Sequence, residues 1–317
     1  MSPPRRRGLR RIGYAVIAVV LAATMATGAH VAHADTNRSA KRLVVHDNNI
    51  ENMAGCAGNN FDHLVDYLKK QDKSPDIFTV QQISNQKQLN TLVKRLTAEL
   101  PGVYAGKIAI ADPGSMGYTS GCKTKKNQQT NAIIYRSGRL EARKSTTWRS
   151  DAPAQPKKGT GNCKNLEPTA TSQDRVVNLA VKFYDKVADH YVSVASVHWP
   201  TKKWHGPDCA DENLRETNAA IENLGGAALK IIAGDTNATT PSQDWWQKAR
   251  DLGYRDPIAE KCGARVCSDR YNTIGKRRID HILVKSGHGF GHVDNITESM
   301  AGGKYSDHRA LIAYVKY

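Results

Sequence analysis

The stretch Ile231-Ile232-Ala233-Gly234-Asp235-Thr236-Asn237 decides how this chain folds. Its apolar run, which begins at Leu229, predicts a buried strand that ends at Gly234. The strand leads directly into Gly-Asp-x-Asn, so Asp235 and Asn237 should project from its carboxyl end on the same side. A carboxylate and an amide in that place suit a divalent cation and a phosphate oxygen. The alternative is an Asx turn that only closes the strand.

Three other stretches carry possible acid–base groups. Residues 190–199 predict a strand that reaches His198, and a histidine there is as often structural as catalytic. In Arg278-Ile279-Asp280-His281-Ile282-Leu283-Val284, Asp280 lies inside an apolar strand, and a buried carboxylate needs a partner. The last strand opens with Ser306-Asp307-His308. We expect Asp280 to orient His308 as a general base, unless the two residues are unrelated.

The mature part of the chain alternates strands with amphipathic helices. Residues 42–50, 76–83, 131–136, 140–147, 175–184, 190–199, 229–234, 278–285 and 308–315 predict strands. Apolar residues at helical spacing predict helices near residues 61–68, 89–100, 214–224 and 245–252. This order predicts an α/β fold, a four-layer α-β-β-α sandwich in which two packed mixed sheets have helices outside.

These stretches, in this order, resemble the endonuclease/exonuclease/phosphatase superfamily, typified by deoxyribonuclease I and the abasic-site endonucleases. Asn49-Ile50 resembles the family's opening Asn-Ile strand, and His198 matches its first catalytic histidine. The Gly-Asp-x-Asn motif and the closing Asp280 and Asp307-His308 motifs match in register. The resemblance runs from Arg42 to Tyr317 and implies one catalytic domain, for which we expect the bounds 35–317.

The resemblance implies in-line hydrolysis of a phosphodiester. His308, held by Asp280, would deprotonate the attacking water, and His198 would stabilise or protonate the departing oxygen. The metal and the scissile phosphate would be held by Asp235, Asn237, Asn49 and Asp307. The implied cofactor is a divalent metal, Mg²⁺ in the first place, with Mn²⁺ or Ca²⁺ as alternatives. Arg175, at the start of a predicted strand, would contact a phosphate.

One position departs from the family pattern. The second strand of the family ends in Gln-Glu, and this glutamate is a principal magnesium ligand, but here the residues are Gln81-Gln82. Gln82 occupies the position of a metal ligand without its negative charge. Asp47 or Glu51 could supply that charge, since residues 47, 49 and 51 alternate along one predicted strand. Two alternatives stay open, a weaker metal site with a higher metal requirement and a catalytically inactive scaffold.

The N-terminal residues predict a secretion signal. Five arginines precede an apolar run over residues 14–26, and Ala32-His33-Ala34 follows as a cleavage pattern. The run is shorter than the roughly 20 residues that a membrane-spanning helix needs. We therefore expect residues 1–34 to be removed and the mature protein to be secreted, without stable membrane insertion. Nothing in the sequence requires a partner subunit, so we expect a monomer.

Six cysteines behind an export signal predict disulfides. Cys262 and Cys267 would close a short loop. Three pairings remain open for the other four, Cys56, Cys122, Cys163 and Cys209. Since the chain contains no Cys-x-x-Cys spacing, the sequence argues against a thiolate zinc site.

The charge of the chain favours nucleic acid as substrate. The formal net charge of +16 becomes +11 for residues 35–317, because residues 1–34 contain five Arg and no acidic residue. Basic residues near the site, Lys202 and Lys203 foremost, would bind backbone phosphates, whether of DNA or RNA. Further lysines lie in two polar loops, near residues 123–126 and 157–164. The rival substrates are phospholipids, as in secreted sphingomyelinases, with Trp199 and Trp204 as a possible membrane-docking tip. A binding module without turnover is the non-enzymatic alternative.

Overall fold

The strand that ends in Gly-Asp-x-Asn, β8 (Leu229–Asp235), lies inside a six-stranded sheet. It pairs parallel with β7 (His190–His198) and antiparallel with β10 (Asp280–Lys285). The structure is a computed structural model that describes residues 42–51, 61–113, 129–150, 176–202, 205–242 and 244–317. All of them belong to the compact unit formed by residues 33–317.

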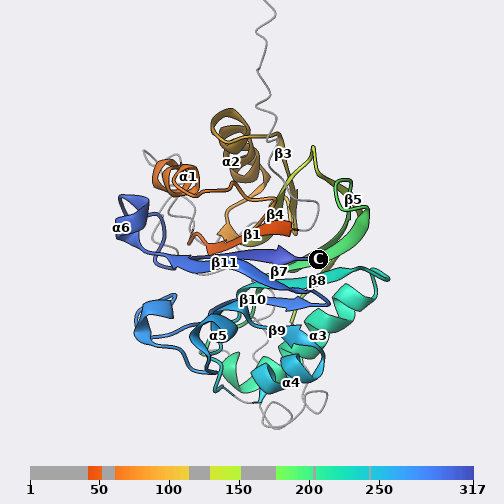
Figure 1. Ribbon diagram of the computed structural model, residues 1–317, viewed down its shortest axis with the longest axis vertical. Coiled ribbons are helices and arrows are strands. Elements are labelled where there is room, and N and C mark those ends of the chain that lie inside the picture. Colours follow the sequence, from red (N-terminus) through yellow and green to blue (C-terminus); the bar gives the residue numbers. More distant parts are fainter. Residues whose placement is uncertain (1–41, 52–60, 114–128, 151–175, 203–204, 243) are drawn as a thin grey trace, which may run out of the picture. The chain divides into compact units, whose positions relative to one another are not determined.

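The described strands form two mixed sheets of six (Figure 1). The first has the order β11-β12-β1-β2-β4-β3, and the second β5-β6-β7-β8-β10-β9. The remaining bounds are β1 (Arg42–Asn49), β2 (Ile77–Ile83), β3 (Tyr104–Ile108), β4 (Thr130–Arg136), β5 (Leu140–Trp148), β6 (Asn178–Asp185), β9 (Tyr254–Arg255), β11 (Gly289–Ile296) and β12 (Ala310–Lys316). Each sheet contains one parallel pair, β1 with β2 and β7 with β8.

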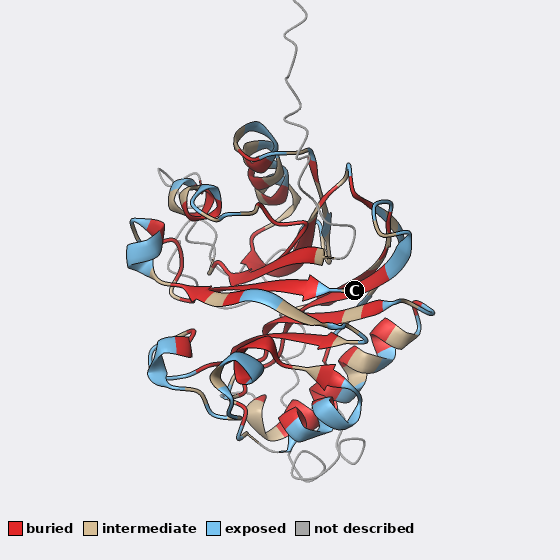
Figure 2. Cartoon of the chain, in the orientation of Figure 1, coloured by how far each residue is buried: buried red, intermediate tan, exposed pale blue. Residues whose placement is uncertain are grey.

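The two sheets pack face to face through alternate residues of their strands. In β8, Leu229, Ile231 and Ala233 face the other sheet, and Val45 and Leu311 of the first sheet belong to the same apolar cluster. Period-two alternation therefore also points Asp235, two residues beyond Ala233, toward the first sheet. Figure 2 shows the central strands of both sheets buried along most of their length.

Helices cover the outer faces of both sheets, which confirms the predicted four-layer α-β-β-α sandwich (Figure 1). Apolar residues of α1 (Asp62–Lys69) and α2 (Gln86–Glu99) pack on the first sheet. Those of α3 (Ala210–Glu222) and α4 (Trp245–Asp251) pack on the second. Two shorter helices are α5 (Pro257–Cys262) and α6 (Glu298–Ala301). Within the described residues, no helix has the length and apolar character that crossing a membrane requires.

The disulfide between Cys262 and Cys267 is present, with 5.8 Å between the two Cα atoms. Cys209 is also disulfide-bonded. Cys56, Cys122 and Cys163 lie outside the described residues, so the three pairings of the other cysteines stay open.

Candidate active site

Polar residues at the ends of four strands meet where the two sheets face each other. Because β7 and β8 run parallel, His198 lies beside Asp235 in the register of the sheet. Since β10 runs antiparallel to β8, its first residue, Asp280, pairs with Asp235 from the other side. Asn49 ends β1 in the opposite sheet, and its Nδ2 donates to Oδ2 of Asp235 at 2.9 Å. Asp235 is therefore the residue around which the others gather.

Gly234 allows β7 and β8 to approach closely just before this point. Its φ angle is +145°, and a Cβ atom placed on it would lie 2.0 Å from the carbonyl oxygen of Val197. No side chain could be accommodated there without moving one of the strands. The glycine of Gly-Asp-x-Asn thus sets the spacing that puts His198 next to Asp235.

His308 is held by a buried carboxylate. Its Nδ1 atom lies 2.8 Å from Oδ2 of Asp280, and its Nε2 atom lies 3.8 Å from Oδ2 of Asp235. Burial alone would lower the pKa of His308, but the carboxylates of Asp280 and Asp235 outweigh it and raise the pKa to about 10. Burial would raise the pKa of Asp280, but the charge and hydrogen bond of His308, with smaller contributions from Thr273 and His281, together keep it below its ordinary value. The pairing expected from the sequence is thus found as a short hydrogen bond.

Asp235 has an unusually basic carboxylate. Burial and the neighbouring charge of Asp280 raise its pKa to about 7, against the opposing effect of His308. The Nε2 atom of His198 lies 3.5 Å from its Oδ2 atom. The backbone N–H of His198 donates to Oδ1 of Asn178 at 2.9 Å, which fixes the end of β7. A proton can therefore be held at several positions within a few ångströms.

Asn237 closes β8 with a turn beside Asp235. Its backbone N–H donates to Oδ1 of Asp235 at 2.8 Å, which is the Asx turn that the sequence left as an alternative. Its φ angle is 51°, and its Nδ2 donates to the carbonyl oxygen of Trp199 at 2.8 Å. The turn uses Oδ1 of Asp235, and Oδ2 accepts the hydrogen bond from Nδ2 of Asn49. The turn and a role in the site are thus compatible.

Glu51 and Asp307 form the carboxylate pair on the side of Asn49. The pKa of Glu51 is raised by burial and then by the adjacent carboxylate of Asp307, to which its side chain is hydrogen-bonded. Asn49 links Glu51 to Asp235. Its Oδ1 accepts from the backbone N–H of Glu51 at 3.0 Å, and its Nδ2 donates to Asp235. The alternation assumed from the sequence does not extend this far, because β1 ends at Asn49 and Glu51 has a φ angle of 47°.

Gln82 lies at an irregularity in β2. Its φ angle is 58°, and the pairing of β2 with β4 shifts register between Val80 and Ile83. Its Oε1 accepts from Nε2 of Gln129 at 3.4 Å. The structure thus joins Gln82 to a neutral neighbour.

Asp47, the other carboxylate considered from the sequence, is completely buried. Its Oδ1 accepts from Oγ1 of Thr79 at 2.6 Å and from Nε2 of Gln81 at 2.9 Å. Burial, followed by the charges of Asp280 and Asp235, holds its pKa well above the ordinary value. Asp47 belongs to the polar packing beneath the site, and of the two candidates only Glu51 adjoins Asp307.

The donor set of the site fits a hard divalent cation. Asp235, Asp280 and His308 offer ligand atoms within 4.8 Å of one another. Glu51, Asp307 and Asn49 offer further carboxylate and amide oxygens on the adjoining side. Carboxylate and amide oxygens are the ligands that Mg²⁺ prefers.

The candidate substrate-binding residues from the sequence are only partly described. Lys202 is exposed, four residues after His198, whereas Arg175 and Lys203 lie outside the described residues. Lys276 and Arg277, which were not among the residues predicted from the sequence, are exposed on a turn shortly before Asp280. Lys276 and Arg277 directly precede the strand predicted over residues 278–285, and the turn was not predicted from the sequence.

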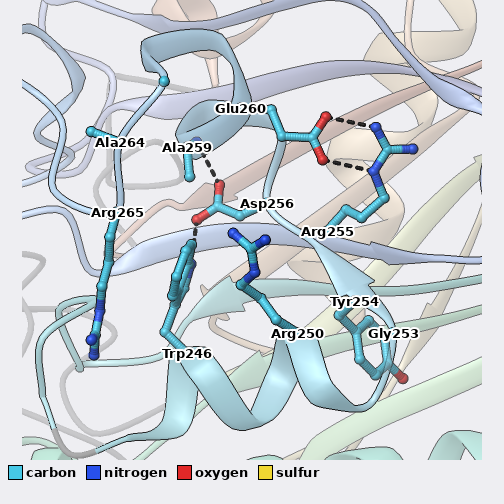
Figure 3. A pocket seen from close by; sticks show the side chains of 11 residues that line it. Trp246, Arg250, Gly253, Tyr254, Arg255, Asp256, Ala259, Glu260, Ala264 and Arg265 are labelled. Atoms are coloured by element: carbon cyan, nitrogen blue, oxygen red, sulfur yellow. Dashed lines mark hydrogen bonds and ion pairs between the residues drawn. The ribbon is translucent and has the colours of Figure 1, made fainter.

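The outer side of the second sheet supports the catalytic strand ends. Asp256 accepts from Nε1 of Trp246 at 3.0 Å (Figure 3) and pairs with Arg278 at 2.9 Å. Nε and Nη2 of Arg265 donate to the carbonyl oxygen of Thr240, three residues after Asn237. Trp246, Asp256 and Arg265 border a pocket of about 420 Å³ between α4 and α5. Arg265 thus anchors the loop after β8, and Asp256 anchors Arg278, two residues before Asp280.

Comparison with known proteins assigns the chain to a family. A family model described as the Endonuclease/Exonuclease/phosphatase family matches residues 52–308. The chain belongs to the endonuclease/exonuclease/phosphatase family. Members of this family hydrolyse phosphoester bonds and use divalent metals. No curated protein matches the chain.

Solved structures of this family have the same fold. D. rerio TDP2 complexed with single strand DNA product aligns with a TM-score of 0.58 at 18% identity, over 87% of this chain and 99% of that chain. The human Nocturnin catalytic domain with bound sulfate anion gives 0.59 at 15% identity, over 87% and 94%. The endonuclease/exonuclease/phosphatase from Bacteroides vulgatus gives 0.56 at 18% identity, over 87% and 98%. At these identities the likeness establishes the fold alone.

Proposed function

We propose that this protein is a secreted, divalent-metal-dependent nuclease that hydrolyses the phosphodiester bonds of nucleic acids. The observation that carries the proposal is the convergence of His198, Asp235 and His308, with Asp280 behind His308. Two imidazoles on either side of one buried carboxylate can accept a proton from a nucleophile and deliver one to a leaving group.

Each residue has a role that follows from its position. His308, oriented by Asp280 through Nδ1, has its Nε2 atom on the side of Asp235, where its neutral form can accept a proton from a water molecule. His198 is placed on the other side of Asp235, where it can stabilise or protonate the departing oxygen. Asp235 and Asn237 orient the water and the phosphate between them.

A divalent cation fits the Glu51–Asp307 side of the site. When bound, it would neutralise charge that develops on the phosphate oxygens. Asn49, anchored to the backbone of Glu51 and to Asp235, couples that side to the proton-transfer residues. In this arrangement Glu51 supplies the negative charge that Gln82 lacks.

Nucleic acid is favoured over lipid as substrate by charge and by the position of an aromatic residue. Residues 35–317 carry a net charge of +11, which suits a polyanion. Trp199, considered as part of a membrane-docking tip, is buried and its ring contacts that of Trp245 at 5.5 Å between centroids. Trp204 lies outside the described residues. D. rerio TDP2, a structural neighbour, has been solved with a single strand DNA product.

Export is part of the proposal. The five arginines and apolar run of residues 1–34 support a cleaved signal, and the Cys262–Cys267 disulfide suits an oxidising compartment. N-terminal sequencing of protein recovered from the medium tests this part, with Asp35 as the expected first residue. A chain that stays inside the cell with its first residues intact would contradict it.

Cleavage of supercoiled plasmid tests the activity. The purified protein is incubated with magnesium, manganese or calcium, and with chelator, beside His198→Ala and the exposed control His288→Ala. We expect metal-dependent nicking that is lost in His198→Ala and retained in His288→Ala.

Three other outcomes are informative. Cleavage of RNA alone would restrict the substrate to RNA. Hydrolysis of sphingomyelin vesicles without any cleavage of nucleic acid would replace the proposal with a phospholipase. Inactivity toward all three, with every metal, would leave a phosphate-binding protein without turnover.

A further inference from the structure

A tight basic turn lies beside the candidate active site. Residues 274–277 form it, with hydrogen bonds in both directions between the backbones of Ile274 and Arg277 at 2.9 and 3.1 Å. Gly275 has a φ angle of 53°, which the turn requires. Lys276 and Arg277 are both exposed. The backbone of this turn is therefore fixed while its two cationic side chains face solvent.

The turn is attached to the catalytic residues on both sides. Oγ1 of Thr273, just before the turn, accepts from the backbone N–H of Asp280 at 3.2 Å. The carbonyl oxygen of Thr273 accepts from the backbone N–H of Arg309 at 2.7 Å, and Arg309 follows His308 directly. The turn therefore keeps a fixed position relative to the Asp280–His308 pair.

The turn and His308 also border the same cavity. This cavity has a volume of about 420 Å³, and Thr273 and Gly275 line it together with Asp307, His308 and Arg309. The wall on the α6 side carries Glu298, Thr297 and Ser299. A ligand that reaches His308 through this cavity passes the turn.

The charges of the turn are not compensated. Within the described part of the chain, the side chains of Lys276 and Arg277 make no ion pair or hydrogen bond, in contrast to two nearby arginines. Arg278 pairs with Asp256 at 2.9 Å, and Arg270 lies 3.4 Å from Asp294. Two acids line the cavity, the exposed Glu298 on the opposite, α6-side wall and the partly exposed Asp307 beside His308, and neither pairs with Lys276 or Arg277 among the described residues. The exposed end of the turn, which adjoins the cavity wall at Gly275, therefore attracts anions.

We propose that Lys276 and Arg277 bind backbone phosphates that flank the scissile phosphate of a polynucleotide strand. This proposal rests on the proposed nuclease function and names its substrate as a strand with several phosphates. Each strand of B-form DNA carries one phosphate for about every 3.4 Å of helix axis, so a strand with one phosphate at His308 carries others past the cavity rim. A single phosphodiester, such as a phospholipid head group, has no phosphate to place there.

The salt dependence of binding tests the proposal independently of turnover. Binding of a fluorescent single-stranded DNA of about twelve nucleotides is measured by anisotropy with chelator present, from about 50 to about 200 mM salt. The variant is Lys276→Gln/Arg277→Gln. The control is Lys87→Gln/Lys94→Gln, which removes the same charge from two exposed lysines of α2. Near-UV circular dichroism verifies that both variants are folded.

Loss of two phosphate contacts lowers the slope of log K against log salt by about 1.4 for a single strand. Over this salt range the wild type should therefore lose about sevenfold more affinity than the variant of the turn. The control should keep the wild-type slope. An unchanged slope in the variant, an equal drop in the control, or a wild type that does not bind DNA would each overturn the proposal. Failure of the nuclease function alone would instead show as intact, salt-dependent binding without cleavage.

Discussion

The Nδ1 atom of His308 lies 2.8 Å from Oδ2 of Asp280, and this hydrogen bond joins the two sheets. Asp280 begins β10 in the second sheet, whereas His308 lies two residues before β12 in the first. The bond between Asn49 and Asp235 is a second connection of the same kind, at 2.9 Å. The candidate catalytic residues are therefore brought together by the packing of the sheets and not by either sheet alone.

Replacing Asp280 with Asn should lower kcat by about 10²- to 10⁴-fold, because an amide neither fixes the imidazole in the same way nor stabilises its charge. It should also change the pH profile. A general base works in its neutral form, so activity rises with pH through the pKa of His308. The carboxylate of Asp280 raises that pKa, so its removal should move the rising limb toward lower pH. The pH dependence of kcat/KM measures both effects.

Asp269→Asn is the matched control for this substitution, since Asp269 is exposed. It should keep both the rate and the profile of the wild type. If the pH profile of Asp280→Asn had the same shape as that of the wild type, whatever its absolute rate, His308 would not be the titrating base.

Glu51 should be a metal ligand that replaces the charge missing at Gln82. Glu51→Gln removes one of two adjacent carboxylates, and we expect the affinity for Mn²⁺ to fall by about 10- to 100-fold. Gln82→Glu adds a charge at the position where the family carries its glutamate, and should raise the affinity. Calorimetric titration with Mn²⁺ measures both without reference to turnover.

The control for the metal experiment is Glu141→Gln, an exposed residue that pairs with Arg143 at 2.9 Å. Its Mn²⁺ affinity should equal that of the wild type. If Glu51→Gln binds Mn²⁺ as tightly as the wild type does, Glu51 is not a ligand, and the charge that Gln82 lacks is not replaced.

Much of the fold could be predicted because its strands are apolar runs. The predicted strand over residues 229–234 is observed as β8 (Leu229–Asp235). Three strands were missed, of which β9 (Tyr254–Arg255) has only two residues. β3 (Tyr104–Ile108) follows a Pro-Gly turn and contains glycine, and β11 (Gly289–Ile296) has glycine and polar residues at most positions. The start of α3 was placed too late, since its first turn buries Asp211 and Glu212 instead of apolar residues.

The site was predictable to the extent that its residues lie in regular strands. Asp235 and Asp280 follow from strand parity and antiparallel pairing. Glu51 does not, because the chain leaves β1 at Asn49 and its carboxylate is placed by a turn with a positive φ angle. Lys276 and Arg277 were missed for the same reason, since turn geometry separates them from the strand that they precede in sequence.

Arg139, which lies outside the candidate active site, should contribute strongly to the stability of the folded protein. Its guanidinium is 3.1 Å from a carboxylate oxygen of Asp76 and 2.8 Å from one of Asp185, and all three side chains are buried. Arg139→Met leaves two buried carboxylates without this cation, so the free energy of unfolding should fall by about 3–5 kcal/mol. Urea unfolding measures the change. Arg143→Met, which breaks an exposed pair with Glu141, should change it by at most about 1 kcal/mol.

His46 should make the protein sensitive to acid. Its ring is fully buried beside Tyr67 and Phe78, and burial, followed by the charge of His292, lowers its pKa from 6.5 to about 3. In the unfolded chain the ring binds a proton near pH 6.5, whereas in the folded protein it stays neutral down to about pH 3. The unfolded state therefore gains protons first as the pH falls, and stability declines by up to about 1.4 kcal/mol per pH unit in this window.

His46→Leu removes this titration and keeps an apolar side chain of similar size against Tyr67 and Phe78. The free energy of unfolding, measured with urea at several values between about pH 4 and pH 7, should depend less steeply on pH in the variant. The two curves should separate progressively as the pH falls, with the variant the more stable at the acidic end. His288→Leu, a control substitution at an exposed position, should follow the wild type. Parallel curves for His46→Leu and the wild type would mean that His46 accepts its proton in the folded state, and that the acid sensitivity arises at other groups.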